Sequence, residues 1–123
     1  MPQQSRTVVA VLEDLFFTVK IGDAAKRAGL QAVFCKTEET ALERIREQPL
    51  LIVLDLNCAS VDPVRFVSDI KTGEHKGVPL IGYVSHVQGE LKQRAQEAGC
   101  DMVMARSAFS TNLPQIFRRH AGL

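Results

Sequence analysis

The chain has 123 residues, 46% of them hydrophobic and 24% charged, with a formal net charge of +1. This length suits one domain with one core, and the balanced charge gives no long-range field that would attract nucleic acid or an anionic membrane. We therefore expect a single domain over residues 1–123, with no nucleic acid and no membrane among its partners.

The cysteines and the N-terminus predict where the protein works. Cys35, Cys58 and Cys100 are widely spaced and form neither a disulfide framework nor a metal-type CxxC pair. The N-terminal MPQQSRT is polar, and the longest apolar runs are far shorter than the about 20 residues that span a bilayer. These features predict a cytoplasmic protein with reduced thiols.

Apolar runs alternate with stretches of helical periodicity along the chain. The first strand is predicted at 7–12, and the helix after it ends at Gly29, a residue type that often terminates helices. The second strand is predicted at 32–35, and the next helix begins at the cap Thr37 and ends before Pro49. The remaining predicted elements are a strand at 50–57, a helix over 62–70, a strand at 79–84, a helix over 91–98, a strand at 101–105 and a helix from about 112–114 to 120.

The arrangement of these elements predicts the fold class. Five strand–helix units favour an α/β fold, an open and mostly parallel sheet with helices on both faces. The strand at 50–57 is apolar on both sides, as expected of a central strand. The chain stops directly after the fifth helix, so no effector domain is expected.

Acidic residues follow two of the predicted strands. Glu13 and Asp14 come after the first strand, and Asp55 ends the third. Ligands of such sheets bind beyond the carboxyl ends of the strands, where the strand order reverses. If the first and third strands are neighbours, three carboxylates meet there, and their repulsion raises a pKa or attracts a cation. Magnesium, which prefers oxygen ligands, suits such a site.

Three segments resemble the receiver domain of two-component response regulators. VVAVLED (8–14) resembles its first strand and acidic pair, LIVLDLN (51–57) the strand with the phospho-acceptor aspartate, and AGCDMVM (98–104) the entry to its fifth strand. The resemblance covers about residues 6–121 and implies a flavodoxin-like, doubly wound (βα)5 fold with five parallel strands in the order 2-1-3-4-5.

The resemblance also implies a chemistry. Asp55 would accept a phosphoryl group, Asp14 and Asp55 would bind Mg²⁺ together with the backbone carbonyl of Asn57, and Glu13 would act through a water on the metal. A histidine kinase or phosphotransfer protein would donate the group, and another protein would recognise the product. The chain would then be a stand-alone phosphorelay protein, an enzyme only in self-catalysed phosphotransfer and dephosphorylation at Asp55.

The sequence departs from the receiver pattern at three places. Where receivers have Thr or Ser at the end of the fourth strand, the chain has Val84 followed by Ser85. Arg106-Ser107 replaces the lysine–proline pair after the fifth strand, so we expect a trans peptide bond there. Val103 occupies the position of the aromatic residue that moves on activation.

These departures leave an alternative open. In this alternative the chain is a pseudo-receiver that acts as a phosphorylation-independent interaction module.

A small hydrolase or a nucleotide-binding enzyme is disfavoured, because neither a GxGxxG nor a Walker pattern occurs. Tyr83, the only tyrosine, is expected to pack with a solvated hydroxyl, and His86 is expected to be a solvated loop residue.

Overall fold

Five parallel strands form one sheet in the order β2-β1-β3-β4-β5, which confirms the predicted fold class and strand order. The computed structural model describes residues 5–85 and 89–122. The strands are β1 (Thr7–Val11), β2 (Gln31–Cys35), β3 (Leu51–Asp55), β4 (Leu80–Val84) and β5 (Met102–Ala105). The helices are α1 (Leu15–Arg27), α2 (Glu38–Ile45), α3 (Pro63–Thr72), α4 (Gly89–Glu97) and α5 (Arg106–Ala121).

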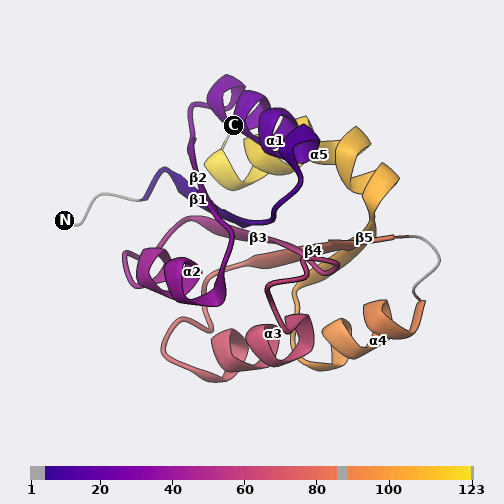
Figure 1. The fold of residues 1–123 in the computed structure, drawn as a ribbon. Helices are drawn as coiled ribbons and strands as arrows, with labels where there is room; N and C mark the ends of the chain where they lie inside the picture. Colours follow the sequence, from indigo (N-terminus) through magenta and orange to yellow (C-terminus); the bar gives the residue numbers. More distant parts are fainter. Residues whose placement is uncertain (1–4, 86–88, 123) are drawn as a thin grey trace.

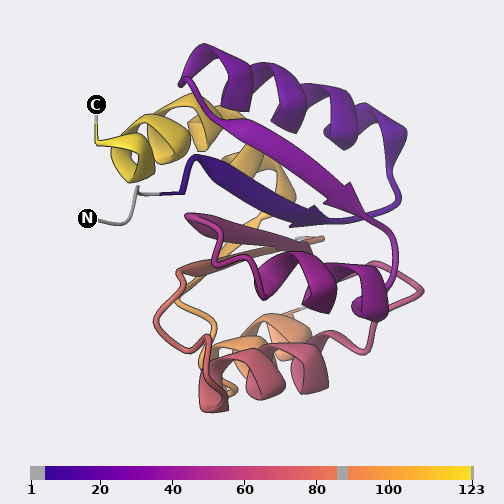
Figure 2. The ribbon, with the colours of Figure 1, turned by 90° about the vertical axis from the view of Figure 1, so that its left-hand side faces the viewer.

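The helices form two layers around the sheet (Figures 1 and 2). Helices α1 and α5 cover one face, and α2, α3 and α4 cover the other. Each layer has its own apolar core against the sheet. No helix in the described part of the chain is long and apolar enough to cross a membrane.

Strand β3 is buried along its whole length, as predicted for a central strand. Its side chains alternate between the two cores. Leu51 and Val53 pack against the α1 and α5 layer, and Ile52 and Leu54 pack on the opposite side. Continuing this alternation, Asp55 at the end of the strand projects on the α1 and α5 side.

Helix caps explain where two of the predicted helices begin. The Thr37 side chain accepts a hydrogen bond from the backbone N–H of Thr40 at the start of α2 (3.2 Å). Asp62 accepts one from Arg65 (3.4 Å) at the start of α3, whose first residue is Pro63. Both caps satisfy backbone donors that have no partner within the helix.

The predicted start of the last helix is wrong. The sequence predicts a start near 112–114, but α5 begins at Arg106 and contains Pro114 in its interior. The Asn112 side chain does not cap; its Nδ2 donates to the carbonyl of Ala108 one turn earlier (2.8 Å). Arg106 therefore stands in the first turn of a helix directly after β5. The described residues contain no cis peptide bond, as expected for Arg106-Ser107.

Candidate functional site

The sheet brings the predicted acidic residues to one edge. Strand β1 lies between β2 and β3, and residues Val8 to Val11 pair in parallel with Leu51 to Leu54. The chain reaches Glu13 and Asp14 directly after β1, while Asp55 ends β3. The three carboxylates therefore lie at the same carboxyl edge, where the strand order reverses.

Asp55 is the one charged residue that is buried in the described part of the chain, with 7% of its surface exposed. Its Oδ1 accepts a hydrogen bond from the backbone N–H of Asn57 (2.9 Å). Burial raises the pKa of Asp55, and the charges of Asp14 and Glu13 raise it further. The Asn57 hydrogen bond and the charge of Arg106 oppose this rise. The carboxylate therefore interacts electrostatically with every ionisable group predicted for the site.

Asp14 has both carboxylate oxygens engaged. Oδ1 accepts from the backbone N–H groups of Phe16 (2.8 Å) and Phe17 (3.4 Å), which makes Asp14 the N-cap of α1. Oδ2 forms an ion pair with Arg106. Asp14 thus holds the start of α1 and the start of α5 together beside Asp55.

Glu13 is held from the loop after β3. Its Oε1 accepts a hydrogen bond from the hydroxyl of Ser60, a contact that the sequence did not indicate. Glu13 is exposed, in contrast to the buried Asp55. The bond joins the two loops that flank the acidic edge.

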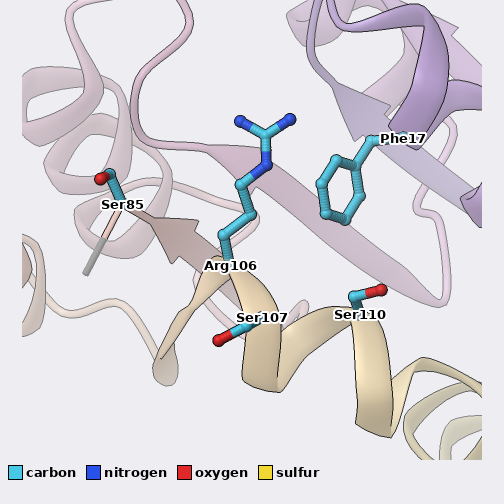
Figure 3. Close-up of a pocket in the computed structure, with 5 residues that line it drawn as sticks. All are labelled: Phe17, Ser85, Arg106, Ser107 and Ser110. Carbon is cyan, nitrogen blue, oxygen red and sulfur yellow. The ribbon is translucent and has the colours of Figure 1, made fainter.

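Arg106 takes the lysine position but binds Asp14 and not Asp55. Its guanidinium carbon lies 4.5 Å from the centre of the Phe17 ring, a cation–π distance. Figure 3 shows the side chain extending from the start of α5 alongside this ring. Both residues line an open cavity of about 360 Å³ whose other walls are Ser85, Ser107 and Ser110. Phe17 was missed in the sequence, because a helical phenylalanine indicates only a core residue.

Val84 and Ser85 are the two candidates for the position at which receivers have a hydroxyl, and they lie in different surroundings. Val84 is 3% exposed and packs in the core on the α2, α3 and α4 side, away from the face of Asp55. Ser85 is half-buried at the cavity, and its backbone N–H donates to Oδ1 of Asn57 (3.0 Å). Asn57 therefore contributes a side-chain contact in addition to the backbone carbonyl considered from the sequence.

The oxygen donors at this edge are of the type that Mg²⁺ prefers. No hydrogen bond reaches Oδ2 of Asp55 from the described residues. No group of three or more His, Cys, Asp or Glu side chains in residues 5–85 and 89–122 forms a metal site by itself. A site with two carboxylates, completed by a backbone carbonyl and waters, fits this arrangement, and its ligand Asp14 is shared with Arg106.

The remaining candidates lie apart from this chemistry or outside the described residues. Val103 is 7% exposed and packs in the core. Cys58 is buried, and burial raises its thiol pKa, which opposes a reactive role. Tyr83 is 1% exposed, so the prediction of a solvated hydroxyl is wrong. His86 lies outside the described residues.

No family model and no curated protein matches the sequence. Many solved structures match the fold. The response regulator CheY4 of Vibrio cholerae is 17% identical at a TM-score of 0.80, with 96% of this chain and 99% of that chain covered. The phosphorylated cyanobacterial phytochrome response regulator RcpA is 18% identical at 0.78, covering 94% and 90%. The Mn²⁺-bound response regulator Rcp1 is 15% identical at 0.74, covering 92% and 89%.

These neighbours are signalling proteins that share the strand order and the layers described above. Each match covers most of this chain and most of the neighbour's chain. The chain therefore has the receiver-domain fold of response regulators.

Proposed function

We propose that the chain is a receiver-like phosphorelay domain that accepts a phosphoryl group on Asp55 with the help of Mg²⁺. The observation that carries this proposal is the position of the Asp55 carboxylate, which is buried and accepts a hydrogen bond at Oδ1 alone from the described residues. It ends the central strand, it is nearly buried, and Arg106 pairs with Asp14 in preference to it. Oδ2 of Asp55 is thus available to form a bond to phosphorus.

The proposed reaction is a phosphoryl transfer between two carriers. An Asp55 oxygen attacks the phosphorus atom and forms an O–P bond, while the P–N bond of a donor phosphohistidine breaks and the released ring nitrogen takes up a proton. Water later cleaves the acyl phosphate, which restores the carboxylate and releases inorganic phosphate. Mg²⁺ at Asp14, Asp55 and the Asn57 carbonyl would neutralise charge on the transferred oxygens.

The solved neighbours support the components of this proposal by analogy of fold. RcpA is phosphorylated in its structure, and Rcp1 is bound to Mn²⁺. The proposed donor is a histidine kinase or a phosphotransfer protein, and a second protein would recognise the modified state. The cytoplasm is the proposed location, supported by the three free and buried cysteines.

A mass measurement tests the proposal directly. The full chain is incubated with Mg²⁺ and acetyl phosphate, in which case acetate leaves as the O–P bond forms. We expect the intact mass to increase by one phosphoryl group. Asp55→Asn abolishes the increase, whereas Asp69→Asn, a change of an exposed carboxylate on α3, retains it. A wild-type chain that gains no mass contradicts the proposal.

The Arg106–Asp14 ion pair favours a second candidate function. A guanidinium already neutralises one of the carboxylates, and Val84 offers no hydroxyl, so the fold can serve as an interaction module without phosphorylation. In that case acetyl phosphate leaves the mass unchanged, and a partner binds the wild-type chain and Asp55→Asn equally tightly.

A further inference from the structure

Tyr83 has a buried hydroxyl without a hydrogen-bond partner in the described chain. The residue is 1% exposed. Leaving a buried hydroxyl unsatisfied is unfavourable, and native structures contain few such groups. The position of this hydroxyl therefore requires an explanation beyond packing, because a phenylalanine would fill the same space without the cost.

Two aromatic rings fix the orientation of the Tyr83 ring. Phe17 of α1 stacks on it with 5.0 Å between ring centres and 24° between ring planes. Phe109 of α5 stacks on it at 4.7 Å and 12°. Because a ring from each of these helices stacks on it, the Tyr83 ring is held in one place, and its hydroxyl is buried.

Tyr83 is the direct neighbour of Asp55 in the sheet. The two residues are paired in register between β3 and β4, where adjacent strands are about 4.8 Å apart. Both side chains project on the α1 and α5 face, since Tyr83 packs in that core with Ile81. Burial raises the pKa of the Tyr83 hydroxyl, and the negative charge of Asp55 raises it further.

The two side chains differ in length. A carboxylate ends close to the sheet, whereas a phenol extends further out from it, so no direct Asp55–Tyr83 hydrogen bond forms in the unmodified protein. A phosphoryl group on Asp55 lengthens that side chain by the phosphorus atom and its oxygens. These oxygens lie further from the sheet than the carboxylate oxygens do, on the side to which Tyr83 projects, and they are strong hydrogen-bond acceptors.

We propose that Tyr83 donates a hydrogen bond to the phosphoryl group carried by Asp55. The contact supplies the hydroxyl that Val84 lacks, from the preceding residue of β4 and on the face that Asp55 shares. The inference rests on the proposed function, because the acceptor exists only when Asp55 is modified.

Beryllium fluoride, which forms a phosphoryl-shaped complex on a carboxylate, provides the test in the presence of Mg²⁺. Fluorine NMR measures its binding to the full-length wild-type chain and to Tyr83→Phe. We expect the dissociation constant to rise roughly three- to tenfold in Tyr83→Phe, the equivalent of one hydrogen bond. The denaturation midpoint of unliganded Tyr83→Phe should equal or exceed that of the wild type, because the hydroxyl has no partner in this state.

A spectroscopic measurement gives an independent result. The chain contains one tyrosine and no tryptophan, so its ultraviolet absorption reports on Tyr83 without interference from other phenols or indoles. We expect the tyrosine band to shift when beryllium fluoride binds. Unchanged absorption together with equal affinity of Tyr83→Phe overturns the inference.

The outcomes separate this inference from the proposed function. If the wild type binds no beryllium fluoride and takes up no phosphoryl group, the proposed function fails, and the inference fails with it. If the wild type binds it, but Ser85→Ala weakens binding and Tyr83→Phe does not, then phosphorylation stands and Ser85 supplies the hydroxyl.

Discussion

Arg106 and Asp14 form an ion pair that joins the first turn of α5 to the N-cap of α1, directly beside Asp55. Phe17 lies against the guanidinium and restricts where it can move. The proposed metal ligand Asp14 is therefore already bound to a cation within the protein. If Asp14 binds Mg²⁺ as proposed, the divalent cation would compete with Arg106 for this carboxylate.

This competition predicts that Arg106→Gln increases the affinity for Mg²⁺. An exposed ion pair is worth about 0.2–1 kcal/mol, so the expected decrease in the dissociation constant is about 1.4- to fivefold. Isothermal titration calorimetry measures it. The control is Arg27→Gln, which removes an exposed guanidinium paired with Asp23 on the same layer of helices and should leave the affinity unchanged. Weaker Mg²⁺ binding by Arg106→Gln would show that the guanidinium assists the metal.

Asp55 predicts a pH dependence of stability. The raised pKa of Asp55 means that folding favours the protonated carboxyl group. Its contribution to stability is therefore fully present below the ordinary pKa of 3.8 and is lost as the pH rises through the higher pKa of the folded state. Asp55→Asn removes this loss and keeps an oxygen for the Asn57 N–H. We expect the variant to be more stable than the wild type at pH 7, and the difference to disappear in acid.

Urea unfolding at a series of pH values, with a chelator present, checks this expectation. Asp69→Asn is the matched control, because Asp69 is exposed and should show no comparable gain. A wild type that is more stable than Asp55→Asn at pH 7 would indicate that the charge is better compensated than burial implies.

The sheet could be predicted from the sequence because its signals are local and agree with one another. The apolar run of β3, the cap at Thr37 and the Asp62-Pro63 start of α3 each specify an element by itself. The acids at the ends of β1 and β3 then follow from topology, since parallel neighbours end at the same edge. Tertiary contacts were not needed for any of these steps.

Contacts between distant helices could not be predicted in this way. Asn112 and Pro114 carry a helix-start signal, but α5 continues through them because it packs against the sheet from Phe109 onward. The stack of Phe17, Tyr83 and Phe109 joins α1, β4 and α5, and no sequence spacing encodes it. The sequence therefore indicated which charged residues form the site but not which residues pack against them.

The ion pair between Lys71 of α3 and Asp101, which precedes β5, gives a prediction about stability. Asp101 Oδ2 accepts from Nζ of Lys71 (2.8 Å) and from the backbone N–H of Leu80 (2.8 Å). The Lys71 side chain is 11% exposed, so its ammonium depends on protein acceptors. Asp101→Ala should lower the free energy of unfolding by about 1.5–3 kcal/mol, the range for hydrogen bonds to charged groups.

The exposed pair of Arg27 and Asp23 provides the comparison for Asp101→Ala. Its atoms are 3.2 Å apart, but the side chains are 79% and 59% exposed. Asp23→Ala should therefore change the free energy of unfolding by no more than about 0.5 kcal/mol. Urea unfolding of both variants measures the contrast, and equal effects would mean that the Asp101 contacts add nothing beyond an ordinary surface pair.

Gly82 lies next to Tyr83 on β4 and leaves room for Leu56, the residue after Asp55. A Cβ at Gly82 would lie 3.1 Å from Cδ1 and 3.2 Å from Cγ of Leu56, and 3.4 Å from Sγ of Cys100. Leu56 is 2% exposed and packs in the core on this side of the sheet. Gly82→Ala should therefore destabilise the protein by about 1–3 kcal/mol through overpacking.

Two comparisons separate overpacking at Gly82 from a general effect of replacing glycine. At Gly77 an added Cβ meets nothing within 4 Å, so Gly77→Ala should be neutral or slightly stabilising. In a Leu56→Ala background the clashing atoms are absent, so Gly82→Ala should cost less than in the wild type. If Gly82→Ala costs the same in both backgrounds, contact with Leu56 is not the cause, and the effect comes from the strand itself.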